Sequence, residues 1–214
     1  MSLDEQVPDA VFKVIVIGDS AVGKSCFTLQ FVEGRFKEDH AATIGVEYWS
    51  KVVAVADKKT IKLQVWDTVG SMQAGQESFR AITRTFYRNV NAVLLMYDLT
   101  RSDTFETLDS WLKEVRQNAD PEVCIFLVGN MSDLAEEERE VSTEKAAKFC
   151  ADYSLQGFME ASAKADVNVS VVFERIAEAL YRKEVEREEK DRLEMPPPIQ
   201  LVPRTDKKKA KKCC

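Results

Sequence analysis

The amino-acid sequence predicts an α/β fold: a mostly parallel sheet of six strands, one of them antiparallel, with helices on both faces. Short apolar runs rich in Val, Ile and Leu alternate along the chain with longer amphipathic stretches, as in linked strand–helix units. A turn containing glycine separates the first apolar run from the first amphipathic stretch. Polar residues follow several later runs, at the positions where α/β sheets place their ligands.

The first half of the chain is expected to form three strands and two helices. Residues 11–17 are a β-branched run that predicts a buried strand, and residues 24–33 have the pattern of an amphipathic helix. Residues 46–56 and 60–66 alternate apolar and polar side chains around a short polar turn, which predicts an antiparallel hairpin. The remaining segments of this half are expected as loops over 34–43 and 67–76 and as a helix over 77–88.

The second half continues the alternation of strands and helices. Asp103 is expected to cap the first helix of this half, and the prolines at 196–198 stop the last helix from continuing. The strands expected here cover residues 92–97, 123–129 and 157–160, and the helices cover residues 103–118, 142–153 and 168–193.

Length and composition favour one domain followed by a tail. We expect a flexible N-terminus over residues 1–10, one globular domain over 11–182 and a disordered tail over 183–214. The tail is dense in charge, then rich in proline, and ends in Lys207-Lys-Lys-Ala-Lys-Lys-Cys-Cys214.

Charge and cysteine usage exclude several classes of protein. The formal net charge of −6 argues against nucleic acid as a partner. No apolar run approaches the roughly 20 residues of a membrane-spanning helix, so any membrane contact has to come from an anchor. The five cysteines show neither a disulfide framework nor paired metal-ligand spacing, which fits the reducing cytosol.

Residues 18–25, Gly-Asp-Ser-Ala-Val-Gly-Lys-Ser, match the phosphate-binding pattern G-x-x-x-x-G-K-[ST]. In such a loop between a strand and a helix, backbone N–H groups point at an anion and the helix N-terminus favours it further. Gly18 and Gly23 let the backbone approach closely. We expect Lys24 to reach the β- and γ-phosphates and the Ser25 hydroxyl to ligate Mg²⁺. The flanking strand and helix disfavour a chance turn and predict a P-loop NTPase fold.

Further polar residues follow later elements in the order that a nucleotide and a metal require. Thr43 offers a hydroxyl to the metal, and Asp67 ends a strand at the position of a metal-shell carboxylate. Asn130 and Asp133 follow a buried strand, where a carboxylate can accept hydrogen bonds from N1–H and the amino group of guanine but not from adenine. The segment 162–164 is expected to close over the base. Together these groups predict a guanine-nucleotide site, although each alone is weak evidence.

With these motifs the chain resembles the Rab family of Ras-superfamily small GTPases, over about residues 11–180 and at its C-terminus. The matching stretches are GDSAVGKS, ATIGVEYWS, KLQVWDT, AGQESFRAITRTFYRNV, LLMYDLT and EASAK. IGVEY, KLQVW, the SFRAITRTFYR segment and the terminal Cys-Cys indicate Rab rather than Ras, Rho or Arf. The SFRAITRTFYR segment is similar to one subgroup of Rabs.

The resemblance implies roles for individual residues. Cys26 would contact the α-phosphate through its backbone, and Phe36 would stack on guanine. Tyr48, Trp66 and Phe86 match the aromatic triad by which Rabs report nucleotide state to effectors; ordinary core packing is the competing interpretation. The nucleotide-binding residues implied are Gly18, Asp19, Ser20, Ala21, Val22, Gly23, Lys24, Ser25, Cys26, Phe36, Thr43, Gly70, Asn130, Asp133, Ser162, Ala163 and Lys164, and the metal ligands are Ser25, Thr43 and, through water, Asp67.

The second switch departs from the family pattern WDTAGQE. This sequence reads Trp66-Asp-Thr-Val-Gly-Ser-Met-Gln-Ala-Gly-Gln-Glu77, as if residues 69–73 were inserted. The spacing matters because Asp67 faces the metal, the glycine N–H three residues later meets the γ-phosphate, and the next residue, a glutamine, orients the attacking water.

Two registers of this segment compete. In the first, Gly70 keeps its spacing from the metal-shell aspartate, but Ser71 takes the place of the glutamine. In the second, Gly75 and Gln76 keep their order and the extra residues loop out. The first register needs no extra loop for the phosphate contact and is slightly favoured. Taken from both registers, the candidate catalytic residues are Lys24, Gly70 and Gln76. Both registers predict a more mobile second switch and slower intrinsic hydrolysis, although an activating protein can supply an arginine and a glutamine in trans.

Met131 stands where the family has the lysine of NKxD. Methionine keeps much of the apolar packing of the lysine stem but loses its ammonium group. We therefore expect guanine selectivity to survive through Asp133 and nucleotide affinity to fall.

Cys213 and Cys214 fit double geranylgeranylation, as in Rabs, and not a C-a-a-X box. The neighbouring lysines suit an anionic membrane surface. The resemblance implies a monomer that cycles between cytosol and the cytoplasmic face of an intracellular membrane. Its implied partners are effectors, an exchange factor, a GTPase-activating protein and a prenyl-binding carrier.

Three functions remain in view. A GTP/GDP switch that hydrolyses GTP slowly with Mg²⁺ and regulates vesicle trafficking is the leading hypothesis. A Rab-like adaptor that binds nucleotide without turnover is the alternative, because of the altered second switch. A P-loop kinase of small metabolites is disfavoured, because the basic Cys-Cys tail would have no use there.

Overall fold

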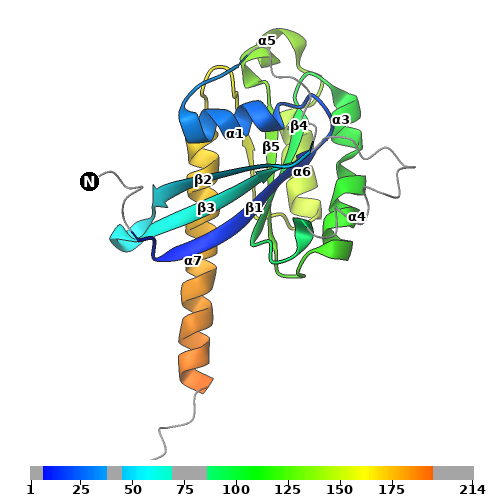
Figure 1. Ribbon diagram of the computed structural model, residues 1–214. Coiled ribbons are helices and arrows are strands. Elements are labelled where there is room, and N and C mark those ends of the chain that lie inside the picture. The colour runs from blue at the N-terminus through cyan, green and yellow to red at the C-terminus, as the bar shows by residue number, and fades with distance from the viewer. Residues whose placement is uncertain (1–6, 38–44, 69–85, 195–214) are drawn as a thin grey trace, which may run out of the picture.

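One six-stranded sheet forms the centre of the fold (Figure 1). The computed structural model describes residues 7–37, 45–68 and 86–194, without the side chains of residues 57 and 194. The sheet order is β2-β3-β1-β4-β5-β6; β2 runs antiparallel to β3, and every other neighbouring pair is parallel. This confirms the expected α/β architecture. The strands are β1 (Ala10–Gly18), β2 (Glu47–Ala54), β3 (Thr60–Asp67), β4 (Ala92–Asp98), β5 (Cys124–Asn130) and β6 (Gly157–Glu160).

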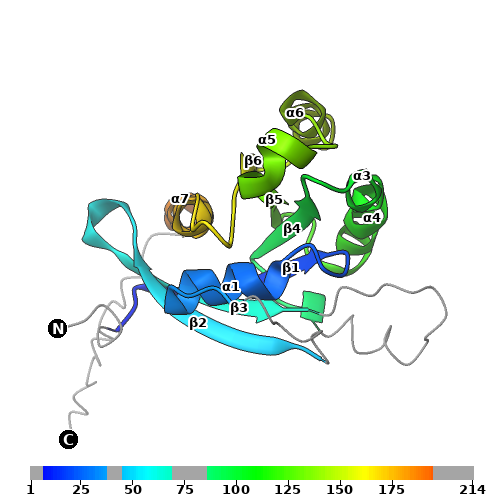
Figure 2. The same cartoon turned by 90° about the horizontal axis from the view of Figure 1, so that it is seen from above.

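Helices cover both faces of the sheet (Figure 2). α1 (Lys24–Glu33) and α7 (Val169–Glu194) lie on one face, and α3 (Ser102–Glu106), α4 (Leu108–Asn118) and α6 (Thr143–Asp152) lie on the other. The short α5 (Ala135–Glu138) follows β5.

The central strand β1 contributes to both cores because successive side chains of a strand point to opposite faces. Val14 and Val16 belong to the core under α1 and α7, whereas Ile15 and Ile17 belong to the core under α3, α4 and α6. All four side chains are buried. The apolar run that predicted this strand is therefore continuous because both of its faces are covered.

The helices differ from the expected ones in three places. The helix expected over 103–118 is divided at Thr107, whose hydroxyl donates to the carbonyl of Thr104 at 3.0 Å. α3 begins at Ser102, and its N-cap residue is Arg101, so the prediction that Asp103 caps this helix is wrong. The carboxylate of Asp103 instead accepts from the N–H of Thr104, inside the first turn. α5 was not expected.

The C-terminal helix runs as expected from the sequence, since α7 covers Val169–Glu194. Residues 183–194 belong to this helix, so the prediction that a disordered tail begins at residue 183 is wrong for this segment. The helix expected over 77–88 lies almost entirely outside the described residues. No helix in the described part of the chain combines the length and apolar character that a membrane crossing requires.

The sheet brings the predicted site residues to one edge. In the strand register Val16 lies opposite Asp67, and Asp98 lies opposite Asn130. Since β1, β3, β4, β5 and β6 run parallel, the loops that follow them meet at this carboxyl edge.

Candidate functional site

The phosphate loop, residues 18–25, joins β1 to α1, and both of its glycines are required by the backbone. Gly18 has a φ of 142°, and a Cβ there would lie 2.2 Å from the carbonyl oxygen of Met96 on β4. Gly23, the residue before α1, has a φ of 89°, and a Cβ there would lie 2.3 Å from Nδ2 of Asn130. A side chain at either position would have to displace the neighbouring atoms of β4 or β5 and would strain the backbone.

Lys24 is a buried cation inside this loop, with 6% of its surface exposed. Its Nζ donates to the carbonyl oxygens of Gly18 at 3.0 Å and Asp19 at 2.6 Å. Burial lowers the pKa of Lys24 to about 8, while the carboxylates of Asp67 and Asp19 act in the opposite direction. A phosphate group would add further negative charge beside this buried ammonium, so the loop is suited to an anion.

Ser25 and Asp67 form the part of the site that suits a metal ion. The hydroxyl of Ser25 donates to the carboxylate of Asp67, which is completely buried at the end of β3. The end of β3 is fixed in turn by the hydroxyl of Thr68, which donates to the carbonyl of Val16 at 2.7 Å. Hydroxyl and carboxylate oxygens are the hard donors that Mg²⁺ takes, usually together with waters and substrate phosphates. The two side chains therefore fit the predicted magnesium site.

Asn130 connects three loops at the expected base side of the site. It is 1% exposed; its Nδ2 donates to the carbonyl of Val22 at 2.9 Å, and its Oδ1 accepts from the N–H of Ala163 at 3.1 Å. The hydroxyl of Ser162 donates to Oδ1 of Asp133 at 2.5 Å. Asn130 thus holds the phosphate loop against the base loop, while Asp133 remains exposed beside them.

Met131 and Phe36 are the apolar side chains of the expected base pocket. Met131 has a left-handed backbone with a φ of 68°, and its Cε lies 3.7 Å from the position of a Cβ on Gly23. Its side chain therefore covers the phosphate loop with a thioether stem and no charge. Phe36 is partly buried against the core under α1 and α7. The stacking of Phe36 on guanine stays a prediction, as does the covering role of the exposed Lys164.

Cys26, in the first turn of α1, is half-buried, and its Sγ donates to the carbonyl of Lys37 at 3.7 Å. Burial, and after it the charge of Asp67, raises the pKa of this thiol. The side chain is therefore a neutral packing group, and its predicted phosphate contact would use only the backbone.

The three aromatic residues predicted as an effector surface are neighbours. Tyr48 meets Trp66 edge to face with ring centroids 5.2 Å apart, and Trp66 lies 6.5 Å from Phe86. Nζ of Lys13 lies 5.0 Å from the Trp66 ring and donates to the carbonyl of Phe86. Tyr48 is 47% exposed, so this group, which we call the aromatic cluster (Tyr48, Trp66 and Phe86), is only partly core packing.

Sequence reasoning missed the residues that hold the phosphate loop from outside. The carboxylate of Asp19 accepts from Nε1 of Trp111 and from the hydroxyl of Thr107, each at 2.8 Å. A threonine and a tryptophan four residues apart lie on one side of a helix, and a buried indole N–H needs an acceptor. The spacing of Thr107 and Trp111 was therefore the one sequence signal for these contacts, but it did not show that Asp19 is the acceptor.

The phosphate loop, Asp67, the segment from Asn130 to Asp133 and the segment from Ser162 to Lys164 lie at the carboxyl edge of the sheet, at the ends of β1, β3, β5 and β6. That these residues bind a nucleotide stays a prediction. Thr43, Gly70, Gln76, Cys213 and Cys214 lie outside the described residues, and their roles stay predictions.

A comparison with models of protein families adds independent support. The model described as the Ras family matches residues 13–182, which is more than half of the chain. The matched region contains the phosphate loop, Asp67, and the segment from Asn130 to Lys164. The chain therefore belongs to the Ras family and is a small GTPase of the Ras superfamily.

Proposed function

We propose that this small GTPase is a Rab-type switch, anchored to an intracellular membrane, that regulates vesicle trafficking through its effectors. Ras-family proteins bind GTP and GDP, typically with Mg²⁺, and generally hydrolyse GTP. The assignment to the Rab type within that family rests on the IGVEY and KLQVW motifs, the aromatic cluster and the terminal Cys-Cys.

The residues of the site have separate tasks in this function. The N–H groups of residues 18–25 and the ammonium of Lys24 bind the phosphates and stabilise charge that develops during transfer. Ser25 and Asp67 would hold Mg²⁺, which supplies further neutralisation of phosphate charge when bound. Asp133 selects guanine through its carboxylate, and Asn130 keeps the base loop against the phosphate loop.

The single observation that best supports a Rab-type switch is the position of the aromatic cluster. Trp66 precedes the buried carboxylate of Asp67 on β3, and its ring contacts the exposed ring of Tyr48 on β2. A shift of β3 at the nucleotide would therefore change a surface that a partner can read.

Binding to a panel of purified Rab effector domains tests this proposal. The GTP-loaded chain should bind at least one domain more tightly than the GDP-loaded chain, and Tyr48→Ala should remove the difference. Val171→Ala, which changes an exposed apolar residue on α7, is the matched control. Equal binding of both nucleotide states to every domain would contradict a Rab-type switch.

The membrane anchor is proposed from Cys213, Cys214 and the adjacent lysines. Each buried CH₂ of a prenyl chain contributes about 0.8 kcal/mol, so two chains hold a protein stably where one is marginal. Mass spectrometry of the protein from cells should find two geranylgeranyl groups. The double substitution Cys213→Ser, Cys214→Ser should move the protein from membranes to the cytosol, and an unchanged distribution would contradict the anchor.

Slow intrinsic hydrolysis is proposed from the altered spacing of the second switch. Single-turnover hydrolysis of GTP should be faster after deletion of residues 69–73, which restores the family spacing between Asp67 and Gln76. Equal rates for the two proteins would show that the spacing does not limit the reaction.

A nucleotide-binding adaptor without turnover is the second candidate, and the same altered spacing favours it. Hydrolysis assays with and without a Rab-directed activating protein separate the two. A switch is stimulated, whereas an adaptor keeps its GTP under both conditions.

A further inference from the structure

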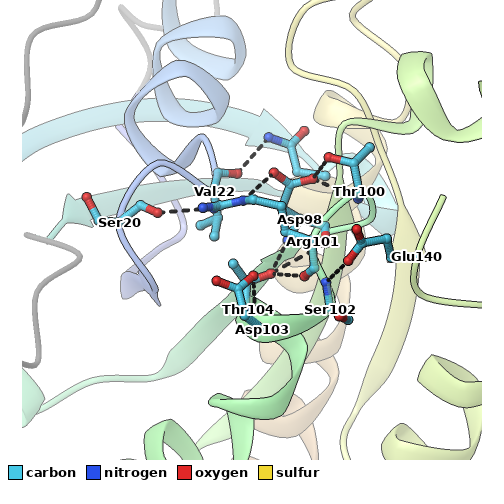
Figure 3. A network of polar contacts seen from close by, with 10 residues as sticks. Ser20, Val22, Asp98, Thr100, Arg101, Ser102, Asp103, Thr104 and Glu140 are labelled. Carbon is cyan, nitrogen blue, oxygen red and sulfur yellow. Dashed lines mark hydrogen bonds and ion pairs between the residues drawn. The ribbon is translucent and has the colours of Figure 1, made fainter. Parts of the chain in front are cut away.

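The tip of the phosphate loop is held from outside by Arg101, at the start of α3 (Figure 3). Nη2 of Arg101 donates to the carbonyl oxygen of Ser20 at 3.2 Å. Nε of the same guanidinium donates to Oδ2 of Asp98 at 3.0 Å. One side chain thus bridges the end of β4 and the loop that receives the phosphates.

Arg101 is fixed at both of its ends (Figure 3). Asp98 is 4% exposed, and its other oxygen, Oδ1, accepts from the N–H and hydroxyl of Thr100 at 2.9 and 2.7 Å. The hydroxyl of Thr104 donates to the carbonyl of Arg101 at 2.8 Å. An exposed ion pair contributes little because both of its side chains move. Here the Arg101 side chain is 38% exposed, but its partner carboxylate is buried and its own backbone is tied, so the guanidinium is held more firmly than in a fully exposed pair.

The contact with Ser20 controls the direction of one amide. In a planar trans peptide the C=O of one residue and the N–H of the next point in opposite directions. A donor on the Ser20 carbonyl, outside the loop, therefore aims the N–H of Ala21 at the inside of the loop. Ala21 has a φ of 62°, a left-handed conformation that residues other than glycine rarely adopt. Such a backbone persists only when its surroundings determine it.

We propose that Arg101 is a positioning residue for the phosphates of the bound nucleotide. It locks the Ser20–Ala21 peptide with the Ala21 N–H directed at the anion. The role rests on the GTPase function of the chain and extends it to a residue outside the phosphate-binding motif.

Release of fluorescent GDP in the presence of Mg²⁺ tests the role of Arg101. Arg101→Met keeps the length of the side chain but removes its hydrogen bonds to Ser20 and Asp98. Loss of the charge-assisted bond to the Ser20 carbonyl should accelerate release about tenfold. Arg101→Lys keeps a cation and should recover part of the effect. Arg116→Met is the matched control, because Arg116 donates to the carbonyl of Tyr153 at 3.0 Å, away from the loop.

A spectroscopic measurement separates positioning from general stability. The ³¹P resonance of the β-phosphate of bound GDP should shift in Arg101→Met and stay unchanged in Arg116→Met, with melting temperatures recorded for both. If Arg101→Met does not fold, Arg101→Lys alone decides, since it should still shift the resonance. Release and resonance equal to wild type in a folded variant would overturn the role of Arg101. Absence of GDP binding by the wild-type chain would instead overturn the nucleotide function.

Discussion

The phosphate side and the base side of the site are held by different means. On the phosphate side Lys24 and Asp67 are buried, and the loop is held from inside by Lys24 and from outside by Trp111. On the base side Asn130 is the buried link, while Asp133 and Lys164 are exposed. The departure at Met131 falls on the base side, where the structure accommodates an apolar side chain over the loop. The contrast indicates that phosphate binding uses buried charged groups, whereas base binding uses charged groups that are exposed.

The largest expected effect is on the phosphate side. Lys24→Met removes the buried ammonium, and GDP affinity should fall about 100-fold or more, because charge-assisted bonds to phosphate are lost. Calorimetry measures the affinity. The variant should remain as stable as wild type, since an apolar side chain is easier to bury than a cation. Wild-type affinity in this variant would show that the loop binds phosphates by its backbone alone.

Asn130→Ala tests the buried side chain that joins the base loop to the phosphate loop. It leaves the carbonyl of Val22 and the N–H of Ala163 without their partner, at about 1–3 kcal/mol for each buried group. GDP release should become about 10- to 100-fold faster, and the melting temperature should fall. Asn118→Ala, which removes an amide on α4 that donates to the carbonyl of Glu114, is the control. An equal loss in both variants would contradict a special role of Asn130.

Met131→Lys should strengthen the base side. The restored ammonium should improve GDP affinity by about 1–2 kcal/mol, or about 5- to 30-fold, through a charge-assisted hydrogen bond. Titration of labelled GDP measures the gain. An affinity no higher than that of wild type would mean that methionine already replaces the lysine in full.

The pH dependence of affinity tests the buried cation in another way. The pKa of Lys24 is lowered to about 8 in the free protein, and a bound phosphate raises it by stabilising the charged form. Below pH 8 the lysine is charged before binding; above pH 8 binding has to take up a proton. GDP affinity should therefore fall about tenfold between pH 7 and pH 9. Calorimetry in two buffers at pH 8.5 should detect proton uptake for wild type and none for Lys24→Met.

The smallest expected effect comes from the hydrogen bonds that Trp111 and Thr107 donate to Asp19. Trp111→Phe keeps most of the packing but removes one of the two hydrogen bonds to the Asp19 carboxylate. GDP release should become about two- to tenfold faster, in line with one hydrogen bond of about 0.5–1.5 kcal/mol. Trp49→Phe, on β2, provides the comparison. If GDP release is unchanged in Trp111→Phe, the hydrogen bond from Thr107 is sufficient to position Asp19.

The fold was predictable because its signals are local. The β-branched run of β1 and the pattern of residues 18–25 each lie in one short segment, and α1 begins and ends as the sequence indicates. The hydrogen bonds from Thr107 and Trp111 to Asp19 were not predictable, because these residues lie 88 and 92 residues from Asp19 in the chain. The break between α3 and α4 falls at Thr107, whose hydroxyl also makes one of these contacts with Asp19. The periodicity of the sequence alone would continue the helix through this residue.

The helix α7 has a consequence for the geometry of the whole switch. Its 26 residues form one uninterrupted rod of about 39 Å that starts beside the base loop and leaves the domain on the side away from the phosphate loop (Figure 1). The C-terminal end of α7 therefore lies far from the phosphate loop, at the opposite end of the domain. A tether at that end would leave the guanine edge facing away from its point of attachment, open to the proteins that load and unload it.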